Sequence, residues 1–172
     1  STVENPRTRL NASIRNVENK QDPVCVKSRT GYILMLGKCP LIWVSKLQTE
    51  ISLSTLEAEY IALSTAMRDL LPMRRVLKAV SGHLKVGLAE PAVMNSDVWE
   101  DNNGCLELAT APKLTPRTKH IAVKSHFFRS YVGGDTGVHI HRVKSEDNIA
   151  DIFTKGLPKE VFQHLREKMM GW

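Results

Sequence analysis

The chain has 172 residues, of which 42% are hydrophobic, so it is long enough for one compact domain and too short for two comfortable ones. It contains no apolar run of about 18 residues and no charged-then-apolar leader, so we expect an intracellular protein without a membrane span. Its 24 Lys and Arg residues outnumber its 18 Asp and Glu residues, and the net charge of +6 favours polyanionic partners such as nucleic acid.

The first thirty residues are polar and irregular in pattern. Residues 1–9 are expected to lie outside regular structure, and only Thr8–Ile14 has the composition of a short strand. The chain starts at Ser1 rather than at an initiator Met, which suggests that it is cut from a longer polyprotein or from a tagged product. We expect residues 1–172 to form a single domain.

A β-hairpin is predicted next. Tyr32–Leu36 is apolar and strand-like, Gly37 and Lys38 supply a turn, and Leu41–Ser45 returns as the second strand. Within this hairpin we expect Trp43 to be a core aromatic residue.

The longest predicted element is a helix over Ser54–Val80, where apolar residues recur at spacings of three and four. Pro72 lacks the N–H that a helix needs, which predicts a kink or a break into two helices at Leu71. Ser54 and Glu57 form a capping box, so Glu57 has a structural role. Glu59 has no such role, and it is the better candidate for chemistry.

The second half of the chain is predicted to alternate strands and helices, and Trp99 is again expected in the core. In order, we expect a strand at Val98–Trp99 that runs into Asp101, a helix capped by Asn102 or Asn103 and continuing through Ala109, a helix at His120–Val132, a strand at Val138–Val143, and short helices at Ser145–Thr154 and Pro158–Met169.

A stretch without acidic residues separates Glu107 from Asp135 and carries many basic ones. This pattern predicts contacts with nucleic-acid phosphates, although a solvated basic helix face is the alternative. Its basic and histidine residues are Lys113, Arg117, Lys119, His120, Lys124, His126 and Arg129.

Three acidic positions could serve a divalent metal, namely Glu59, Asp101 and Asp151. Mg²⁺ prefers hard oxygen ligands that converge from separate elements, so wide spacing in the sequence is compatible with a site. Taken singly, each of them is more often an ordinary surface acid or a helix cap. Cys25, Cys39 and Cys105 form no C-x-x-C pair and are predicted to be reduced thiols. His139 and His141 are predicted to be a surface pair, not a zinc site.

Several short motifs, taken together and in this order, resemble the ribonuclease H domain of copia-type retrotransposons over roughly residues 10 to 165. The motifs are Lys27-Ser28-Arg29-Thr30-Gly31-Tyr32, Trp43-Val44-Ser45-Lys46-Leu47-Gln48, Leu53-Ser54-Thr55-Leu56-Glu57-Ala58-Glu59-Tyr60-Ile61-Ala62-Leu63, Asp101-Asn102-Asn103, Arg117-Thr118-Lys119-His120-Ile121 and Ala150-Asp151-Ile152-Phe153-Thr154-Lys155.

The resemblance implies an α/β protein of the ribonuclease H-like fold, with a five-stranded mixed sheet flanked by helices. It implies that Glu59, Asp101 and Asp151 are three of four carboxylates that hold two Mg²⁺ ions, or Mn²⁺, against RNA in an RNA/DNA hybrid. A reverse transcriptase domain would belong to the same polyprotein, acting in the cytoplasm within a virus-like particle or in the nucleus. Asn102 and Asn103 would contact 2′-hydroxyls, while Lys113, Arg117, Lys119, His120, Lys124 and Arg129 would bind phosphates or double-stranded nucleic acid.

The sequence departs from the family at the first strand, where an Asp-Ala-Asp pattern is matched by Asn11-Ala12-Ser13. If the first acid is instead placed at a shorter distance before Gly31-Tyr32, it falls on Asn16. The residue at the ligand position is therefore asparagine in either alignment. An amide oxygen brings no negative charge, and we therefore expect weak Mg²⁺ binding and impaired cleavage unless Glu18 or Asp22 substitutes. The alternatives to a nuclease are an inactive nucleic-acid-binding module of the same fold and a packing domain of a polyprotein.

Overall fold

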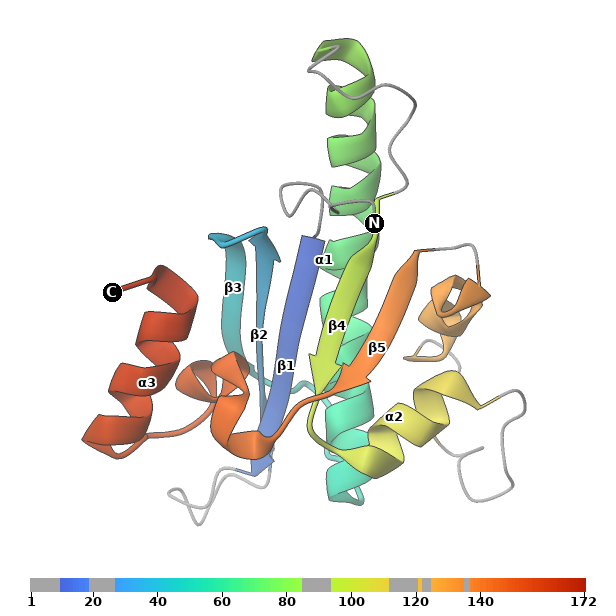
Figure 1. The fold of residues 1–172 in the computed structure, drawn as a ribbon. Helices are drawn as coiled ribbons and strands as arrows, with labels where there is room; N and C mark the ends of the chain where they lie inside the picture. Colours follow the sequence, from blue (N-terminus) through green and yellow to red (C-terminus); the bar gives the residue numbers. More distant parts are fainter. Residues whose placement is uncertain (1–9, 19–26, 85–93, 112–120, 122–124, 135–136) are drawn as a thin grey trace.

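The computed structural model describes residues 10–18, 27–84, 94–111, 121, 125–134 and 137–172. These residues build a five-stranded sheet in the order β3-β2-β1-β4-β5 (Figure 1). The strands are β1 (Leu10–Glu18), β2 (Ser28–Leu36), β3 (Cys39–Leu47), β4 (Ser96–Glu100) and β5 (Val138–Arg142). The first three strands pair antiparallel, whereas β4 runs parallel to both β1 and β5. This is the mixed sheet that the resemblance implied.

The predicted hairpin is present as β2 and β3. Gly37 has a φ of 61°, which a residue without a side chain adopts at little cost, and it makes the tight connection possible. The expectation that Trp43 and Trp99 are core residues is wrong, because they are 61% and 37% exposed. Trp43 lies on β3, the strand at one edge of the sheet, and an edge strand has few neighbours to cover it.

One long helix, α1 (Thr55–Leu84), spans the predicted Ser54–Val80 region without a break at Pro72. Leu70 and Leu71 are both buried beside Pro72, so packing on the sheet holds the helix together where one backbone hydrogen bond is lost. The capping box forms, since the Glu57 amide donates to Ser54 Oγ at 3.1 Å. The Glu57 carboxylate accepts from the Leu53 amide at 2.8 Å, one residue before the expected partner.

The later helices are α2 (Asn103–Thr110), η4 (Phe127–Tyr131), η6 (Ser145–Asp147), η7 (Ile149–Phe153) and α3 (Lys159–Met170), where η denotes a 3₁₀ helix. The predicted helix at Ser145–Thr154 is therefore two 3₁₀ turns, each too short to bury an α-helical face. Of the predicted helix His120–Val132, residues 121 and 125–132 are described, and among them Phe127–Tyr131 form the short 3₁₀ helix η4. Among the described residues, no helix combines the length and apolarity needed to cross a bilayer.

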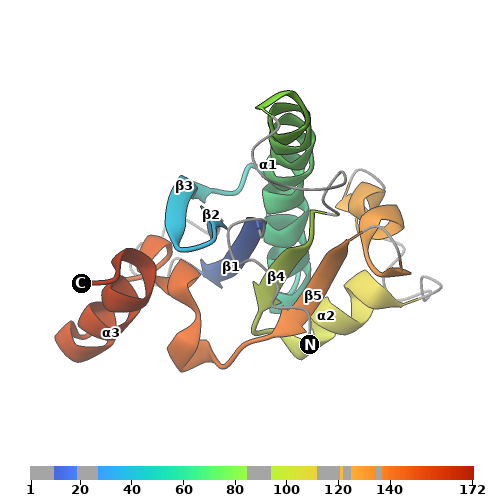
Figure 2. The same ribbon diagram turned by 45° about the horizontal axis from the view of Figure 1, so that its top comes forward.

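The sheet is covered by different elements on its two faces (Figures 1 and 2). On one face α1 crosses the strands, and apolar side chains from β1, β2 and α1 share one core. The fully or almost fully buried members of this core include Ala12, Ile14, Tyr32, Leu34, Tyr60, Leu63, Met67 and Leu70.

The other face of β1 and β2 receives η7 at very short range. A Cβ atom added to Gly31 would lie 2.5 Å from Thr154 Cγ2 and 3.1 Å from the Ala150 carbonyl oxygen. Because real Cβ atoms do not approach that closely, η7 can lie on the sheet only where β2 has a glycine.

Candidate active site

Three carboxylates meet where β4 ends and α1 passes behind it. One ligand oxygen from each of Glu59, Glu100 and Asp101 lies within 4.8 Å of the other two. Glu59 is 5% exposed and Glu100 is 0% exposed, so two of the three acids are removed from water. Two of the three acids proposed from the sequence, Glu59 on α1 and Asp101 after β4, are thus brought together.

Local structure fixes each of these side chains. Glu59 precedes the fully buried Tyr60 near the capped start of α1, which directs it inward. After β4 ends at Glu100, the Asn102 amide donates to Glu100 Oε1 at 3.0 Å, and Asn102 Oδ1 accepts from the Cys105 amide at 3.0 Å. Asn102 is thus the N-cap of α2, and the turn that presents Asp101 is pinned from both sides.

Glu100 was not among the acids proposed from the sequence. In a regular strand, neighbouring residues point to opposite faces, so Glu100 and Asp101 would be expected to separate. The strand ends at Glu100, and the turn that follows lets Asp101 reach the same place as its neighbour. An acidic pair directly before an N-cap asparagine was the signal that could have revealed it.

The negative charge of this region affects the neighbouring thiol of Cys105. Cys105 is completely buried, and its pKa is raised well above the usual value, first by burial and then by the negative charges of Glu100 and Glu59. It therefore stays a neutral thiol, and both Cys39 and Cys105 are free, as expected. Cys25 lies outside the described residues.

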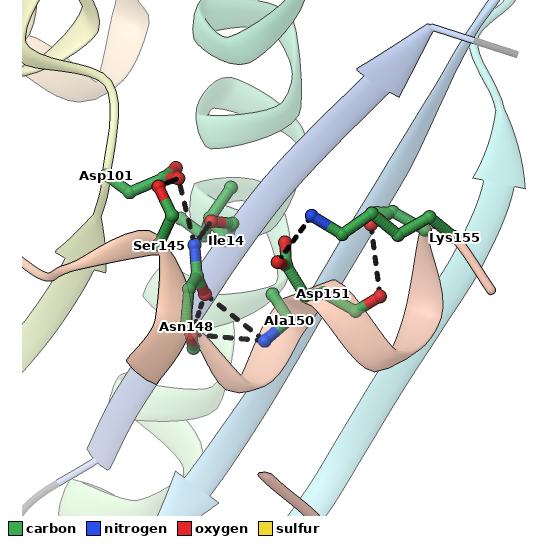
Figure 3. A network of polar contacts seen from close by, with 9 residues as sticks. Ile14, Asp101, Ser145, Asn148, Ala150, Asp151 and Lys155 are labelled. Atoms are coloured by element: carbon green, nitrogen blue, oxygen red, sulfur yellow. Dashed lines mark hydrogen bonds and ion pairs between the residues drawn. The ribbon is translucent and has the colours of Figure 1, made fainter. Parts of the chain in front are cut away.

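A polar network ties Asp101 to the segment after β5 (Figure 3). Ser145 Oγ donates to Asp101 Oδ2 at 2.7 Å, and Asn148 Nδ2 reaches Asp101 Oδ1 at 3.4 Å. The fully buried Asn148 also donates to the Ile14 carbonyl at 2.8 Å and accepts from Ser13 Oγ at 2.5 Å. One side chain thus joins β1, the end of β4 and the start of η7.

Asp151, the third acid proposed from the sequence, is not part of the carboxylate cluster. It lies on η7, is 3% exposed, and its Oδ2 forms an ion pair with Lys155 Nζ at 2.7 Å (Figure 3). The structure therefore brings Glu59 and Asp101 together and gives Asp151 a lysine partner.

The register of β1 locates the two asparagine candidates through the backbone alone. Asn11 pairs with Met35 and directly precedes Ala12, which is level with Val98, so it lies beside the start of β4. Asn16 pairs with Thr30, and continuing the parallel register carries it past the end of β4. The carboxylate cluster lies at that end, so the backbone does not place Asn11 beside it, and a ligand role for Asn11 stays a prediction.

Few of the residues proposed to bind nucleic acid can be placed. Asn102 is a helix cap, Asn103 is exposed at the first position of α2, and the Arg129 guanidinium donates to the Ala111 carbonyl. The other five, Lys113, Arg117, Lys119, His120 and Lys124, lie outside the described residues.

Two of the histidines considered from the sequence, His126 and His141, have polar partners in the structure. His126 Nδ1 shares a hydrogen bond with Tyr60 Oη at 3.0 Å, and burial lowers its pKa, so it adds little positive charge to the basic stretch. His141 Nε2 lies 2.9 Å from Asp97 Oδ1, and its ring centroid is 6.3 Å from that of His139.

The chain is similar in sequence to Pol polyproteins of plant transposons. The chain is 31% identical over 141 residues to the retrovirus-related Pol polyprotein from transposon TNT 1-94 of Nicotiana tabacum, which covers 82% of the chain. It is 33% and 32% identical over 142 residues to the Pol polyproteins from transposons RE2 and RE1 of Arabidopsis thaliana, which cover 83% of it. The chain spans only 9–10% of the length of these relatives. No protein-family model matches it.

Among solved structures, an N-terminal RNase H domain from Mycobacterium tuberculosis, determined as a fusion with maltose binding protein, superposes with a TM-score of 0.55. The match covers 92% of this chain and 96% of the other at 12% identity, so it shows the fold. The chain therefore has the ribonuclease H fold and is related over most of its length to one segment of these plant Pol polyproteins, which fits a ribonuclease H domain of a copia-type Pol.

Proposed function

We propose that this chain is the nuclease domain of a retrotransposon Pol polyprotein and hydrolyses the RNA strand of RNA/DNA hybrids with divalent cations. The observation that carries the proposal is the convergence of Glu59, Glu100 and Asp101 at one end of β4 in a ribonuclease H fold. A role in nucleic-acid chemistry also agrees with the net charge of +6.

The carboxylate cluster suits a hard cation. Like charges within 4.8 Å repel, and the burial of Glu59 and Glu100 strengthens that repulsion, whereas Mg²⁺ or Mn²⁺ would relieve it. Glu59 and Asp101 would hold the cation, and Ser145 and Asn148 would keep the Asp101 carboxylate in place. A bound divalent cation supplies activated water and stabilises the charge on the leaving oxygen.

The proposed partners are an RNA/DNA hybrid and the reverse transcriptase domain of the same polyprotein. We propose that Arg129, Asn103 and the basic residues between Glu107 and Asp135 contact the hybrid. The proposed place of action is the cytoplasm, within a virus-like particle, with the nucleus as the alternative.

Cleavage is expected to be weak. Residues 10–17 of β1 contain no carboxylate, and the strand's single acid, Glu18, is its last residue. The ion pair between Asp151 and Lys155 also favours weak cleavage, because Lys155 already balances the charge of one of the acids proposed to bind metal. These two observations favour the second candidate function, an inactive module that binds hybrid or double-stranded nucleic acid.

A cleavage assay on a labelled RNA/DNA hybrid separates the two functions. With Mg²⁺ or Mn²⁺, slow cleavage that is specific for the RNA strand and is abolished by Asp101→Asn supports the nuclease. Salt-dependent hybrid binding without cleavage supports the binding module. If Asn11 or Asn16 occupies the place of the missing acid, the corresponding variant, Asn11→Asp or Asn16→Asp, should cleave faster than the wild type. If Asp151 belongs to the metal-binding set, Asp151→Asn should cleave more slowly.

A further inference from the structure

Three side chains with flat rings, Trp99, His139 and His141, form a row on the face of the sheet opposite α1, here called the ring row. Val98 belongs to the core that α1 covers, and Ile140 packs against that core. Successive strand residues point to opposite faces, so the ring row lies on the other face. Trp99 is level with His141, and their ring centroids are 5.0 Å apart with the planes tilted by 33°. The His139 ring follows at 6.3 Å from that of His141.

A nearly buried acid supports the ring row. Asp97 lies two residues before Trp99 on the same face of β4, is 8% exposed, and its Oδ1 lies 2.9 Å from His141 Nε2. A carboxylate that contacts one ring nitrogen fixes the orientation of an imidazole. The His141 ring in turn supports the Trp99 ring. This surface is therefore ordered before a ligand arrives, which reduces the entropy lost on binding.

The ring row is accessible to a ligand although the acid that supports it is not. Trp99 is 37% exposed, and the His141 side chain is 43% exposed. On this face η7 packs on β1 and β2 and α3 packs on β3, whereas β4 and β5 form the opposite end of the sheet (Figures 1 and 2). Tryptophan side chains that are both exposed and held in place are typical of binding surfaces.

The ring row also lies beside the carboxylate cluster and near a lysine in the chain. Trp99 is two residues before Asp101, a member of the cluster. Lys144 follows His141 by three residues, and its side chain is 79% exposed. Its 3.7 Å contact with Glu146 joins two exposed side chains and is screened by water, so Lys144 can exchange this partner for a phosphate.

Flat rings and a nearby cation together fit a nucleotide. Every base has a π face, so bases stack on aromatic side chains whatever the sequence, while the backbone phosphates pair with lysine. The bases of an RNA/DNA duplex are already stacked on one another, so only an unpaired base can stack on a protein ring. The net charge of +6 favours such a polyanion over a neutral partner.

We propose that the ring row stacks an unpaired base of a single strand that continues beyond the RNA/DNA hybrid. This inference rests on the proposed function and adds a second part to its substrate. Trp99 provides the main stacking surface, Asp97 and His141 hold it in place, and Lys144 pairs with a phosphate next to the stacked base. None of these groups needs a divalent cation to bind the strand.

The test measures binding by the whole chain in EDTA, so that neither metal binding nor cleavage contributes. Fluorescence anisotropy gives the Kd for a labelled single-stranded oligothymidylate, for a blunt RNA/DNA hybrid and for the same hybrid with a single-stranded extension. We expect the extended hybrid to bind more tightly than the blunt one. Trp99→Ala should weaken binding of the single strand by about fivefold or more and abolish the preference for the extended hybrid.

The chain offers a matched control and a direct readout of stacking. Trp43→Ala removes the same side chain from β3, where it is 61% exposed, and should leave every Kd unchanged. Trp99→Phe keeps a flat ring and should retain most of the binding. With Trp43→Phe and Trp172→Phe, Trp99 is the single tryptophan, so an unlabelled oligothymidylate should quench its fluorescence. Quenching needs no loss of the Trp99 ring and carries the test if Trp99→Ala does not fold.

The outcomes distinguish this inference from the function on which it rests. A wild-type Kd for Trp99→Ala on the single strand, or unquenched Trp99 fluorescence, would overturn the stacking role. A folded Trp99→Phe that binds as weakly as Trp99→Ala would overturn it as well. If binding depends on Trp99 but no hybrid is ever cleaved, the stacking site stands and the nuclease is refuted. If hybrids are cleaved while Trp99→Ala binds normally, only the stacking site is refuted.

Discussion

Buried acids among the described residues are stabilised in different ways, and two regions show the contrast most clearly. On η7, Asp151 is 3% exposed and forms an ion pair with Lys155. At the end of β4, Glu59, Glu100 and Asp101 lie within 4.8 Å of one another. The first arrangement pairs one acid with a lysine, whereas the second gathers three acids in one place. Burial of a carboxylate is therefore a poor guide to function until its neighbours are known.

Asn148 lies between these two regions and holds them at a fixed spacing. It contacts Asp101 through Nδ2, and its Oδ1 accepts from the Ala150 amide at 3.2 Å, next to Asp151. The contrast between the paired acid and the clustered acids can be tested by changing Asp101 in the cluster, Lys155 in the ion pair, or Asn148 between them.

The largest effect is expected from Asp101→Asn, which removes one charge from the cluster and keeps its shape. Loss of a metal ligand should cost several kcal/mol of transition-state stabilisation, or more than about a hundredfold in cleavage rate. The measurement is the initial rate on an RNA/DNA hybrid under saturating Mg²⁺. Glu107→Gln serves as the control, and a rate for Asp101→Asn within twofold of the wild type would contradict the metal role of the cluster.

Asn148→Ala should cause the largest loss of folding stability. The change leaves the buried Ser13 hydroxyl and the Ile14 carbonyl without the bonds that Asn148 makes, so we expect about 2–4 kcal/mol less stability. Urea unfolding measures this loss. Asn103→Ala, at an exposed position of α2, is the matched control and should change stability by less than about 0.5 kcal/mol.

A smaller loss is expected from Lys155→Met, which leaves the buried Asp151 carboxylate without this ion pair. The Lys155 side chain is 34% exposed, so solvent screens the pair and the expected loss is about 1–2 kcal/mol. Thermal unfolding of the single and double variants tests it. Combining Lys155→Met with Asp151→Asn should recover most of the loss, and a double variant as unstable as the single one would show that charge is not the cause.

The smallest effect concerns pH and lies outside both acidic regions. Burial lowers the pKa of His126 from its ordinary value of 6.5, so the folded state favours the neutral ring. Its contribution to stability is complete above that value and is lost as the pH falls through it, by less than about 1 kcal/mol. Urea unfolding between pH 7 and 5 should show this slope for the wild type and a reduced slope for His126→Gln.

Local patterns in the sequence predicted much of the fold. The turn at Gly37 predicted the hairpin, and apolar spacing predicted α1; of the kink or break expected at Leu71, before Pro72, the break does not occur. The reason is that Leu70 and Leu71 pack against the sheet, and this tertiary contact outweighs the local preference of proline. Trp43 was misplaced because the pattern of a strand does not tell whether it lies at the edge of a sheet.

The candidate site was predicted in part. Glu59 and Asp101 could be chosen because each lies at the end or start of a clear element. Glu100 was hidden by strand alternation, which holds only up to the last strand residue. The role of Asn148 depends on contact with Ile14, which is 134 residues away, and no local pattern encodes such a contact.

Gly31 allows the segment Ala150–Lys155 to lie directly against the sheet. Any larger residue at this point of β2 would collide with Thr154 and the Ala150 carbonyl, and η7 would have to lift off the sheet together with Asp151. Glycine at position 31 therefore controls how close the Asp151–Lys155 pair lies to the carboxylate cluster, although β2 itself carries none of these acids. The position of Asp151 therefore depends on a glycine in β2, and Gly31→Ala would need a compensating change at Thr154.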